Sequence, residues 1–309
     1  MVKVNFKLLS LLLLILSYSC LSDPSNSDKL FNEFTASTSS AKSSLEVNSS
    51  TYTSSLYPLN ITSWNIRDLG RSKNADELHQ IAQTLRNSDL VAIQEVVAKD
   101  PAGAQAVAKI ADELNRMGYK WDYRVSDPTN SPSAYISERY AYLWKTSKVK
   151  LLNKAFLDKE LEDECLREPF IGKFQMKKGG DPFYIINFHS RKFNDRPEEE
   201  IIHFKYYPER LDSDRIILAG DFNLNEKHKV WNNLYKIGFK SALKETKTTL
   251  KTKCSNGLYL NHSIDNIYFT SSTIKSTSSG SIDIVKDCLN LENARFLSDH
   301  LPVYMNCEL

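Results

Sequence analysis

The segment that most constrains the fold lies at residues 216–223, Ile-Ile-Leu-Ala-Gly-Asp-Phe-Asn. Four apolar residues, two of them β-branched, are followed by a glycine and by two polar side chains around one aromatic, a pattern typical of a buried strand that enters a loop. In α/β proteins ligands bind at the carboxyl ends of such strands, and Gly220 allows a turn or a close backbone approach that a side chain would block. Asp221 and Asn223 would then share one face. An ordinary Asx turn after a strand explains the same residues equally well.

The first 20 residues have the pattern of an export signal. A mainly leucine run at residues 8–16 follows two lysines and is too short to span a bilayer comfortably. Residues 17–19 offer a small-x-small cleavage site, and Cys20 directly after it resembles the lipid-attachment cysteine of a bacterial lipoprotein. We therefore expect an exported protein, either a lipoprotein of the cell envelope or surface that is anchored through Cys20, or a secreted one.

One folded domain is expected at residues 59–309, after a flexible tether at residues 21–58. The tether is dominated by Ser, Thr, Asn and Asp, and such a composition cannot bury enough apolar surface to fold. The whole chain has 41% hydrophobic residues, as globular proteins do, and a net charge of +2 that is too small to indicate a nucleic-acid partner by itself. The partner has to be inferred from the site.

Four cysteines lie in the expected domain: Cys165, Cys254, Cys288 and Cys307. None forms a Cys-x-x-Cys pair, so the spacing argues against structural zinc. In an oxidising compartment they could form two disulfides in any of three connectivities, and free buried thiols are the alternative.

Apolar periodicity predicts a mixed α/β domain. Helices are expected at residues 75–87, 107–117, 198–207 and 228–237, with Gly118 placed to end the second and Pro208 the third. Strands are expected at residues 59–66, 90–93, 140–144, 183–188, 216–222, 264–269 and 301–305. Because the elements do not alternate regularly, the pattern favours one mixed domain over a doubly wound repeat.

Several predicted strands finish in a polar group: Asn65, Glu95, His189, Asp221 with Asn223, Asp265, and Asp299 with His300. Each residue alone has an ordinary explanation as a turn cap, a core histidine or a solvated carboxylate. Their number and shared placement indicate a site instead. Carboxylates, an amide and two histidines can hold a hard cation through oxygen ligands and can move protons near neutral pH.

From about Ile61 to the C-terminus the chain resembles the endonuclease/exonuclease/phosphatase superfamily, and within it the deoxyribonuclease I group. The motifs that carry the resemblance follow the family order: Trp64-Asn65-Ile66-Arg67, Gln94-Glu95-Val96, Ser137-Glu138-Arg139-Tyr140, Arg167-Glu168-Pro169, Phe188-His189, Gly220-Asp221-Phe222-Asn223, Ile264-Asp265-Asn266-Ile267 and Ser298-Asp299-His300. The resemblance implies an α/β fold in which two packed β-sheets are flanked by helices, a four-layer α/β sandwich.

The resemblance also implies a metal site and a phosphate site. Glu95 would bind Mg²⁺, or Mn²⁺, with Asn65 and Asp299 near the metal, which suits the preference of these cations for a few hard oxygen ligands. Arg67 and Arg167 are similar to the phosphate-contacting arginines of the family.

Two His–carboxylate dyads are implied as well, His189 with Glu138 and His300 with Asp265. One dyad would activate water while the other assists the leaving oxygen or stabilises the phosphate. The sequence does not assign these two roles to particular dyads. The resemblance gives the role of orienting the water and the phosphate to Asp221 and Asn223.

The motifs depart from the deoxyribonuclease I pattern at two positions. Val97 stands where that pattern has an arginine that enters the DNA minor groove, and Lys99 is the nearest basic residue. Ile136, beside Tyr135, replaces the tyrosine expected two residues before Glu138. The hydrolytic centre is therefore better supported than the substrate.

We predict a divalent-metal-dependent phosphodiester hydrolase, an exported and monomeric deoxyribonuclease that contacts the DNA backbone with little sequence preference. An enzyme of the same fold that acts on a phospholipid or an inositol phosphoester is the alternative, since loops rather than folds set the substrate. The third hypothesis is an inactive binding module. A lipid enzyme would be expected to carry a hydrophobic loop near the cleft, and no aromatic hairpin of that kind is obvious in the sequence.

Overall fold

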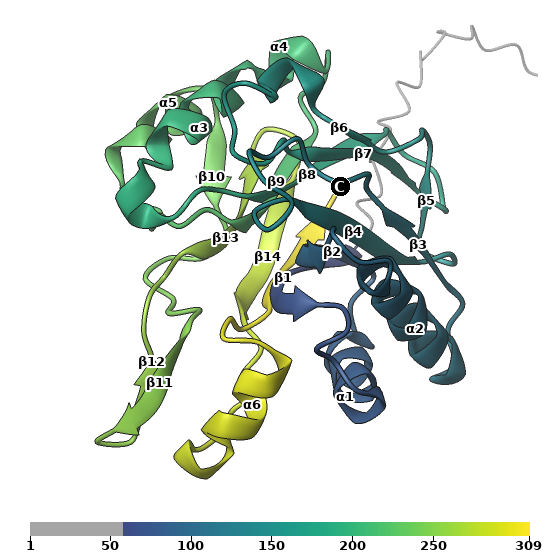
Figure 1. Ribbon diagram of the computed structural model, residues 1–309. Coiled ribbons are helices and arrows are strands. Elements are labelled where there is room, and N and C mark those ends of the chain that lie inside the picture. Colours follow the sequence, from purple (N-terminus) through teal and green to yellow (C-terminus); the bar gives the residue numbers. More distant parts are fainter. Residues whose placement is uncertain (1–57) are drawn as a thin grey trace, which may run out of the picture. The chain divides into compact units, whose positions relative to one another are not determined.

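Two mixed β-sheets pack face to face in the computed structural model, which describes residues 58–309 (Figure 1). The expected export signal, Cys20 and residues 21–57 of the expected tether lie outside the described residues. Within the part that the structure describes, no helix is long and apolar enough to cross a membrane.

The first sheet has six strands in the order β14-β15-β1-β2-β4-β3, in which β1 and β2 are parallel and the other neighbours antiparallel. Helices α1 and α2 cover its outer face, because their apolar residues pack against those of β1, β2 and β4 (Figure 1). The bounds are β1 Pro58–Leu69, β2 Leu90–Val97, β3 Trp121–Val125, β4 Glu138–Lys145, β14 Lys275–Ser281, β15 Val303–Glu308, α1 Ala75–Leu85 and α2 Ala102–Arg116.

The second sheet has the order β10-β13-β9-β8-β7-β5, with β6 paired to β7 and with β8 and β9 parallel. Short helices cover its outer face, where Trp231 stacks on Tyr268 with ring centroids 3.8 Å apart. The strands are β5 Val149–Leu151, β6 Phe156–Leu157, β7 Phe170–Met176, β8 Phe183–His189, β9 Ile216–Asp221, β10 Phe239–Ser241 and β13 Asp265–Thr270. The helices are α3 Glu198–Ile201, α4 Tyr207–Arg210 and α5 Asn232–Lys236, with 3-10 turns η1 Lys159–Leu161, η2 Phe193–Asp195, η3 Ile202–Tyr206 and η4 Lys229–Trp231.

Tyr142 illustrates how the two sheets are joined across the core. It lies on β4 of the first sheet, and its one hydroxyl hydrogen is shared between the carbonyl oxygens of Phe170 (2.6 Å) and Ile185 (2.8 Å) on the second sheet. Its ring stacks on Phe170 at 5.0 Å between centroids. Because the buried hydroxyl has its donor satisfied by the other sheet, the sheets are fixed in position by polar and aromatic contacts together. The predicted four-layer arrangement of helices, two sheets and helices is confirmed.

The predicted helix at residues 198–207 is wrong as one element. The structure has α3, the 3-10 turn η3 and α4 in succession, and Pro208 lies in the first turn of α4 rather than ending a helix. A proline is tolerated there because the first backbone N–H groups of a helix have no intrahelical partner.

A polar hairpin and a short helix near the C-terminus were not predicted. They are β11 Leu250–Ser255, β12 Leu258–Leu260 and α6 Leu291–Leu297, the last preceded by the 3-10 turn η5 Cys288–Asn290. Cys254 and Cys288 form a disulfide that joins the hairpin to η5.

The two-disulfide alternative is wrong, because Cys165 and Cys307 are free and buried. Cys165 packs outside the second sheet, whereas Cys307 lies between the two sheets. The two thiols therefore belong to different layers of the fold.

Candidate active site

Strand register places three chemically important residues in a row across one end of the second sheet. His189 pairs with Asp221 in the parallel β8–β9 ladder, and Asp221 pairs with Asp265 in the antiparallel β9–β13 ladder. The ladder requires glycine at position 220, since a Cβ atom there would collide with the carbonyl oxygen of Phe188. Of the two roles considered for Gly220, the structure has the close approach and not the turn.

Asn65 and Glu95 lie at irregularities inside strands, so the expectation that they end strands is wrong. It is also wrong for Asp265, which begins β13, and for Asp299 and His300, which lie between α6 and β15. β1 continues to Leu69 and β2 to Val97, but the β1–β2 register shifts after Asn65 and the β2–β4 register shifts between Ile93 and Val96. Glu95 itself has a positive φ of 59°. Bulges of this kind redirect a side chain, which here turns the Glu95 carboxylate toward the site.

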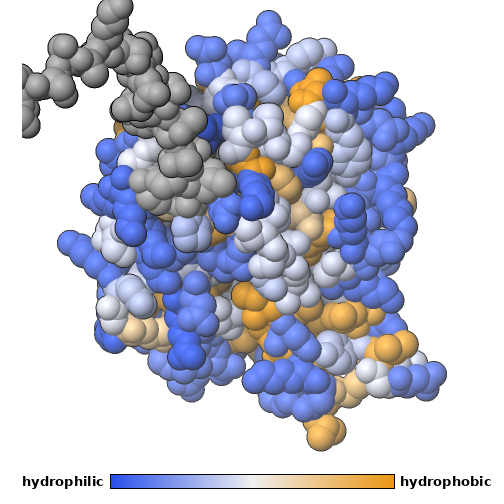
Figure 2. Space-filling model, turned by 180° about the vertical axis from the view of Figure 1, so that it is seen from behind, coloured by the Kyte–Doolittle hydropathy of each residue, from blue (hydrophilic) through white to orange (hydrophobic). Residues whose placement is uncertain are grey.

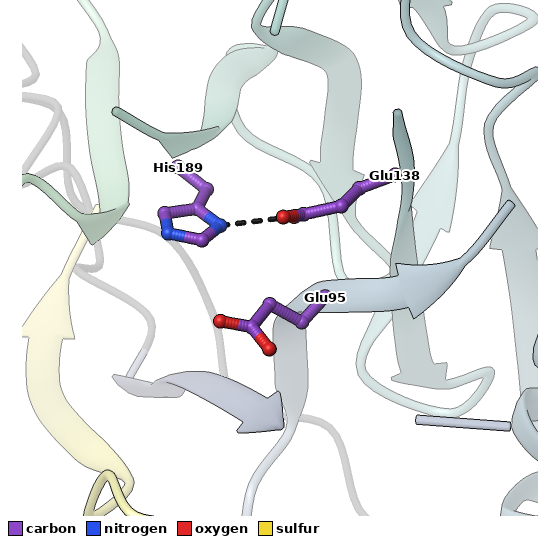
Figure 3. A group of neighbouring side chains, drawn as sticks. All are labelled: Glu95, Glu138 and His189. Carbon is purple, nitrogen blue, oxygen red and sulfur yellow. Dashed lines mark hydrogen bonds and ion pairs between the residues drawn. The ribbon is translucent and has the colours of Figure 1, made fainter. Parts of the chain in front are cut away.

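The first dyad is present and is held by an arginine. His189 Nδ1 lies 2.9 Å from Glu138 Oε2, as Figure 3 shows, and Arg167 Nε lies 2.8 Å from Glu138 Oε1. Arg167 also donates to the carbonyl oxygens of Ile136 (3.2 Å) and Ser190 (3.3 Å). Arg167 therefore orients Glu138 in this structure, and its predicted contact with a phosphate stays a prediction.

The second dyad is held at Nδ1 of the imidazole and at the backbone of His300. His300 Nδ1 lies 3.1 and 2.9 Å from the two oxygens of Asp265, and the Thr248 hydroxyl donates to Asp265 Oδ2 at 2.6 Å. The indole N–H of Trp64 donates to the backbone carbonyl of His300 at 2.9 Å. These contacts fix the ring with Nε2 free to face the centre of the site.

Both imidazoles converge on Asp221. Asp221 Oδ2 lies 3.6 Å from Nε2 of His189 and 3.7 Å from Nε2 of His300, and it accepts a hydrogen bond from Asn65 Nδ2 at 3.1 Å. Its other oxygen accepts the N–H of Asn223 at 3.0 Å, which is the Asx turn considered from the sequence. Since Asn223 has a φ of 50°, strand alternation does not set the direction of its side chain, whose amide donates to the carbonyl of Ser190 at 3.4 Å.

Glu95 lies beside the first dyad and has the contacts of a candidate metal ligand. Its carboxylate, Glu138 and His189 offer ligand atoms within 4.8 Å of one another, and Figure 3 shows the Glu95 carboxylate facing the space beside the dyad. Asn65 Nδ2 donates to Glu95 Oε1 at 2.9 Å, while Asn65 Oδ1 is buried without a hydrogen-bond partner. A buried amide oxygen without a donor, next to a carboxylate, fits a hard cation.

Asp299 lies apart from this group. Its carboxylate is 3.8 Å from Arg67 and 3.9 Å from Arg295, so it contacts arginines at the edge of the site. A second group that could hold a metal is formed by Asp221, Asp265 and His300. The proximity of Asp299 to a metal remains a prediction.

The electrostatics favour charged imidazoles. Burial alone would lower the pKa of His300, but the carboxylates of Asp265 and Asp221 raise it to about 10. Burial opposes the charged form of His189 as well, yet Glu138 raises its pKa above the usual value. Burial, followed by repulsion from Asp265, raises the pKa of Asp221. The His300 imidazole is therefore charged at neutral pH in the metal-free protein, and the charged form of His189 is more favoured than that of a free histidine.

Two residues that support the site were not identified from the sequence. The Ser298 hydroxyl donates to the carbonyl of Asn65 at 2.6 Å and accepts the N–H of His300 at 3.0 Å, so it joins the His300 loop to β1. Ser298 could have been found, because it begins the Ser-Asp-His motif. Thr248, which holds Asp265, lies in a run of lysines and threonines that carries no signal of its own.

One curated protein is similar in sequence, although no protein-family model matches the chain. A deoxyribonuclease of Thioalkalivibrio sp. (strain K90mix) is 28% identical over 206 residues, which cover 64% of this chain and 55% of that protein. The chain thus spans about half the length of this relative.

Solved structures match a larger share of the chain. An endonuclease/exonuclease/phosphatase of Bacteroides vulgatus has a TM-score of 0.62 at 17% identity and covers 82% of this chain and 99% of its own. A mannosyl-6-phosphatase of Bacteroides thetaiotaomicron has a TM-score of 0.59 at 16% identity, with coverages of 81% and 99%. D. rerio TDP2 complexed with a single-strand DNA product has a TM-score of 0.56 at 17% identity, with coverages of 82% and 99%. The described domain has the deoxyribonuclease I-like fold of the endonuclease/exonuclease/phosphatase proteins.

Proposed function

We propose that this protein is a divalent-metal-dependent phosphodiester hydrolase that cleaves DNA. The observation that carries the proposal is the convergence of two His–carboxylate dyads on Asp221, 3.6 and 3.7 Å from the imidazole Nε2 atoms. The relative named a deoxyribonuclease and the structural neighbour complexed with a DNA product support a nucleic-acid substrate. The mannosyl-6-phosphatase with the same fold shows that the fold alone does not select the ester.

Glu95 and the free Oδ1 of Asn65 would hold the cation, which we propose to be Mg²⁺, or alternatively Mn²⁺. When bound there, the cation would polarise a phosphoryl oxygen and neutralise charge that develops on it. Burial raises the pKa of Glu95. A cation would therefore stabilise a carboxylate whose charged form the fold disfavours.

The two imidazoles would carry the proton transfers of hydrolysis. Nε2 of one ring, in its neutral form, accepts a proton from the attacking water as the water oxygen bonds to phosphorus, and Nε2 of the other ring, in its charged form, donates a proton to the leaving oxygen as the P–O bond breaks. Glu138 and Asp265 keep each ring in the tautomer that presents Nε2. The two dyads approach Asp221 at nearly equal distances, so the geometry allows either order.

Incubation of the purified protein with plasmid DNA, RNA, sphingomyelin and inositol phosphates, with and without Mg²⁺, tests this function. We expect cleavage of DNA, loss of cleavage in chelator, and loss of most activity in Glu95→Gln, which replaces an anionic ligand at nearly the same volume. Cleavage that persists in excess chelator would exclude the metal mechanism. A higher catalytic efficiency on a lipid or inositol ester than on DNA would favour the alternative substrate.

We also propose that the protein is exported as a monomer and anchored through Cys20. Fractionation of cells that express the wild type or Cys20→Ala tests the anchor. We expect the wild type in membranes and the variant in the soluble envelope or the medium. Wild-type protein in the cytosol would contradict export.

A further inference from the structure

A cleft of about 670 Å³ lies between the hairpin β11–β12 and α6, at the edge of the proposed active site. Three cationic side chains line it, Arg67, Lys253 and Arg295, and Glu292 is the one acidic residue of its lining. The lining also includes two exposed apolar side chains, Leu289 and Phe296. Figure 1 shows the hairpin and α6 next to each other below the sheets.

Covalent and polar contacts fix the two walls of the cleft. The Cys254–Cys288 disulfide joins β11 to the turn before α6. The Arg295 guanidinium, on α6, donates to the carbonyl oxygens of Leu250 (3.0 Å) and Lys251 (3.2 Å) on β11. A small apolar cluster beneath the hairpin adds packing: Leu250, Val285, Leu291, Ala294 and Leu301. A cleft with fixed walls can bind a ligand without the cost of ordering a loop.

Two of the cations are available to a ligand. The Arg67 side chain is 40% exposed and lies no closer than 3.8 Å to its acidic partner Asp299. Lys253 is exposed and has no acidic partner within ion-pair distance among residues 58–309. An anion in the cleft would therefore meet two cations that are not neutralised by close ion pairs.

The apolar side chains of the cleft indicate the kind of anion. Phe296 is 55% exposed and Leu289 is 91% exposed, which is unusual for large apolar residues. Figure 2 shows apolar surface toward the lower right of the reversed view, on the side of the hairpin and α6. An aromatic face beside cations suits a nucleotide, whose base stacks while its phosphate pairs with the cations.

We propose that this cleft binds an unpaired nucleotide of the DNA strand next to the one being cut. Its phosphate contacts Lys253 and Arg67, and its base packs on Phe296. Arg67 connects the cleft to the active site, because it lines the cleft and pairs with Asp299, which directly precedes His300. Since a base must be unstacked to reach Phe296, the cleft favours single-stranded or frayed DNA over intact duplex. This inference rests on the proposed function and adds a substrate form to it.

Fluorescence anisotropy with labelled single-stranded oligonucleotides tests the cleft, with the full-length protein in chelator so that no cleavage occurs. Lys253→Ala should weaken binding and reduce the slope of log affinity against log salt by about 0.7, as expected for one lost phosphate contact with a single strand. Phe296→Ser should weaken binding about fivefold or more at every salt concentration without changing the slope, because stacking is lost and no charge changes. Lys150→Ala removes an exposed lysine on β5 and should change neither quantity.

The outcomes separate this inference from the proposed function. If the wild type cleaves DNA with Mg²⁺ but Lys253→Ala and Phe296→Ser bind oligonucleotides as tightly as Lys150→Ala, the cleft proposal fails and the function stands. If the wild type neither cleaves nor binds DNA, both fail. Phosphatidylglycerol vesicles form the last arm: loss of vesicle binding in these variants, with oligonucleotide binding intact, would make the surface a membrane contact and overturn the proposal.

Discussion

Replacing Asp221 by asparagine should lower the pKa of both active-site histidines at once. The carboxylate is buried, and its Oδ2 lies 3.6 Å from His189 Nε2 and 3.7 Å from His300 Nε2. The substitution removes a charge at nearly unchanged volume. Two groups donate to the carboxylate now, Asn65 and the backbone of Asn223. Asparagine has a single acceptor oxygen, so we expect one of these hydrogen bonds to weaken as well.

The size of the pKa shift follows from the distance between the Asp221 carboxylate and the imidazole nitrogen atoms. Two unit charges separated by 3.7 Å attract by about 4.5 kcal/mol at an effective dielectric constant of about 20, which equals about three pH units. Opposite charges at such distances shift pKa values by about one to three units in proteins. The pKa of His300, about 10 in the wild type, should therefore fall by about one to three pH units in Asp221→Asn. The pKa of His189 should fall too, since Asp221 is one of the groups that raise it.

NMR titration of the imidazole C–H resonances in the metal-free protein measures both values. Asp76→Asn, which removes an exposed carboxylate on α1, is the matched control and should leave the His300 titration where it is in the wild type. Circular dichroism establishes that the variants are folded. If His300 in folded Asp221→Asn titrates as it does in the wild type, Asp221 does not determine the charge of His300, and the electrostatic coupling inferred for this site is wrong.

Three further outcomes are expected. The pKa of His300 rises from about 6.5 in the unfolded chain to about 10 in the folded one. Its contribution to stability is therefore complete below pH 6.5 and is lost as the pH rises through 10. Urea titrations of metal-free wild type and His300→Gln should show that the variant loses less stability across this range. Gly220→Ala should lower the free energy of unfolding by about 3 kcal/mol or more, measured the same way, since its methyl group meets the carbonyl of Phe188. Ser298→Ala should cost about 1–3 kcal/mol of stability and should lower kcat more than it raises KM, because the serine positions the His300 loop. Equal stability of Ser298→Ala and wild type would show that these hydrogen bonds are dispensable.

The central strands could be predicted because their apolar residues are continuous. Residues 90–93 and 216–219 are buried on both faces, and each segment has a parallel neighbour in its sheet. A strand of this kind reads as an uninterrupted apolar run whatever its neighbours are. The apolar periodicity of α1 and α2 was likewise sufficient to predict both helices, since each packs one apolar face on the first sheet.

The edge elements could not be predicted in the same way. β14 has the sequence Lys-Ser-Thr-Ser-Ser-Gly-Ser and carries no apolar alternation. It is a strand because β15 offers it a backbone partner, and such a long-range pairing leaves no trace in local composition. The hairpin β11–β12 is similar, since a disulfide to η5 and a small satellite core hold its polar strands.

The sequence predicted which residues form the candidate site but not how they are arranged in space. The motifs gave both dyads, and the structure has each pair in hydrogen-bond contact. The position of Asp221 between the two imidazoles could not be predicted from the sequence, because it depends on the register of β8 and β13 against β9. The bulges at Asn65 and Glu95 were hidden for the same reason, since a register shift is a property of two strands and not of one.

The charges of the site explain why a cation and an anionic substrate would bind together. Four carboxylates and three cationic side chains meet there: Glu95, Glu138, Asp221 and Asp265 with His189, His300 and Arg167. With all seven charged the centre has a net charge of −1, which repels a phosphodiester monoanion, and a divalent cation changes this to +1, which attracts it. Burial and the neighbouring Asp265 carboxylate raise the pKa of Asp221, so a cation bound nearby would stabilise a charge that the fold disfavours. It follows that DNA should bind much more weakly without metal, and that the binding which remains should depend on cations outside the centre, among them Lys253.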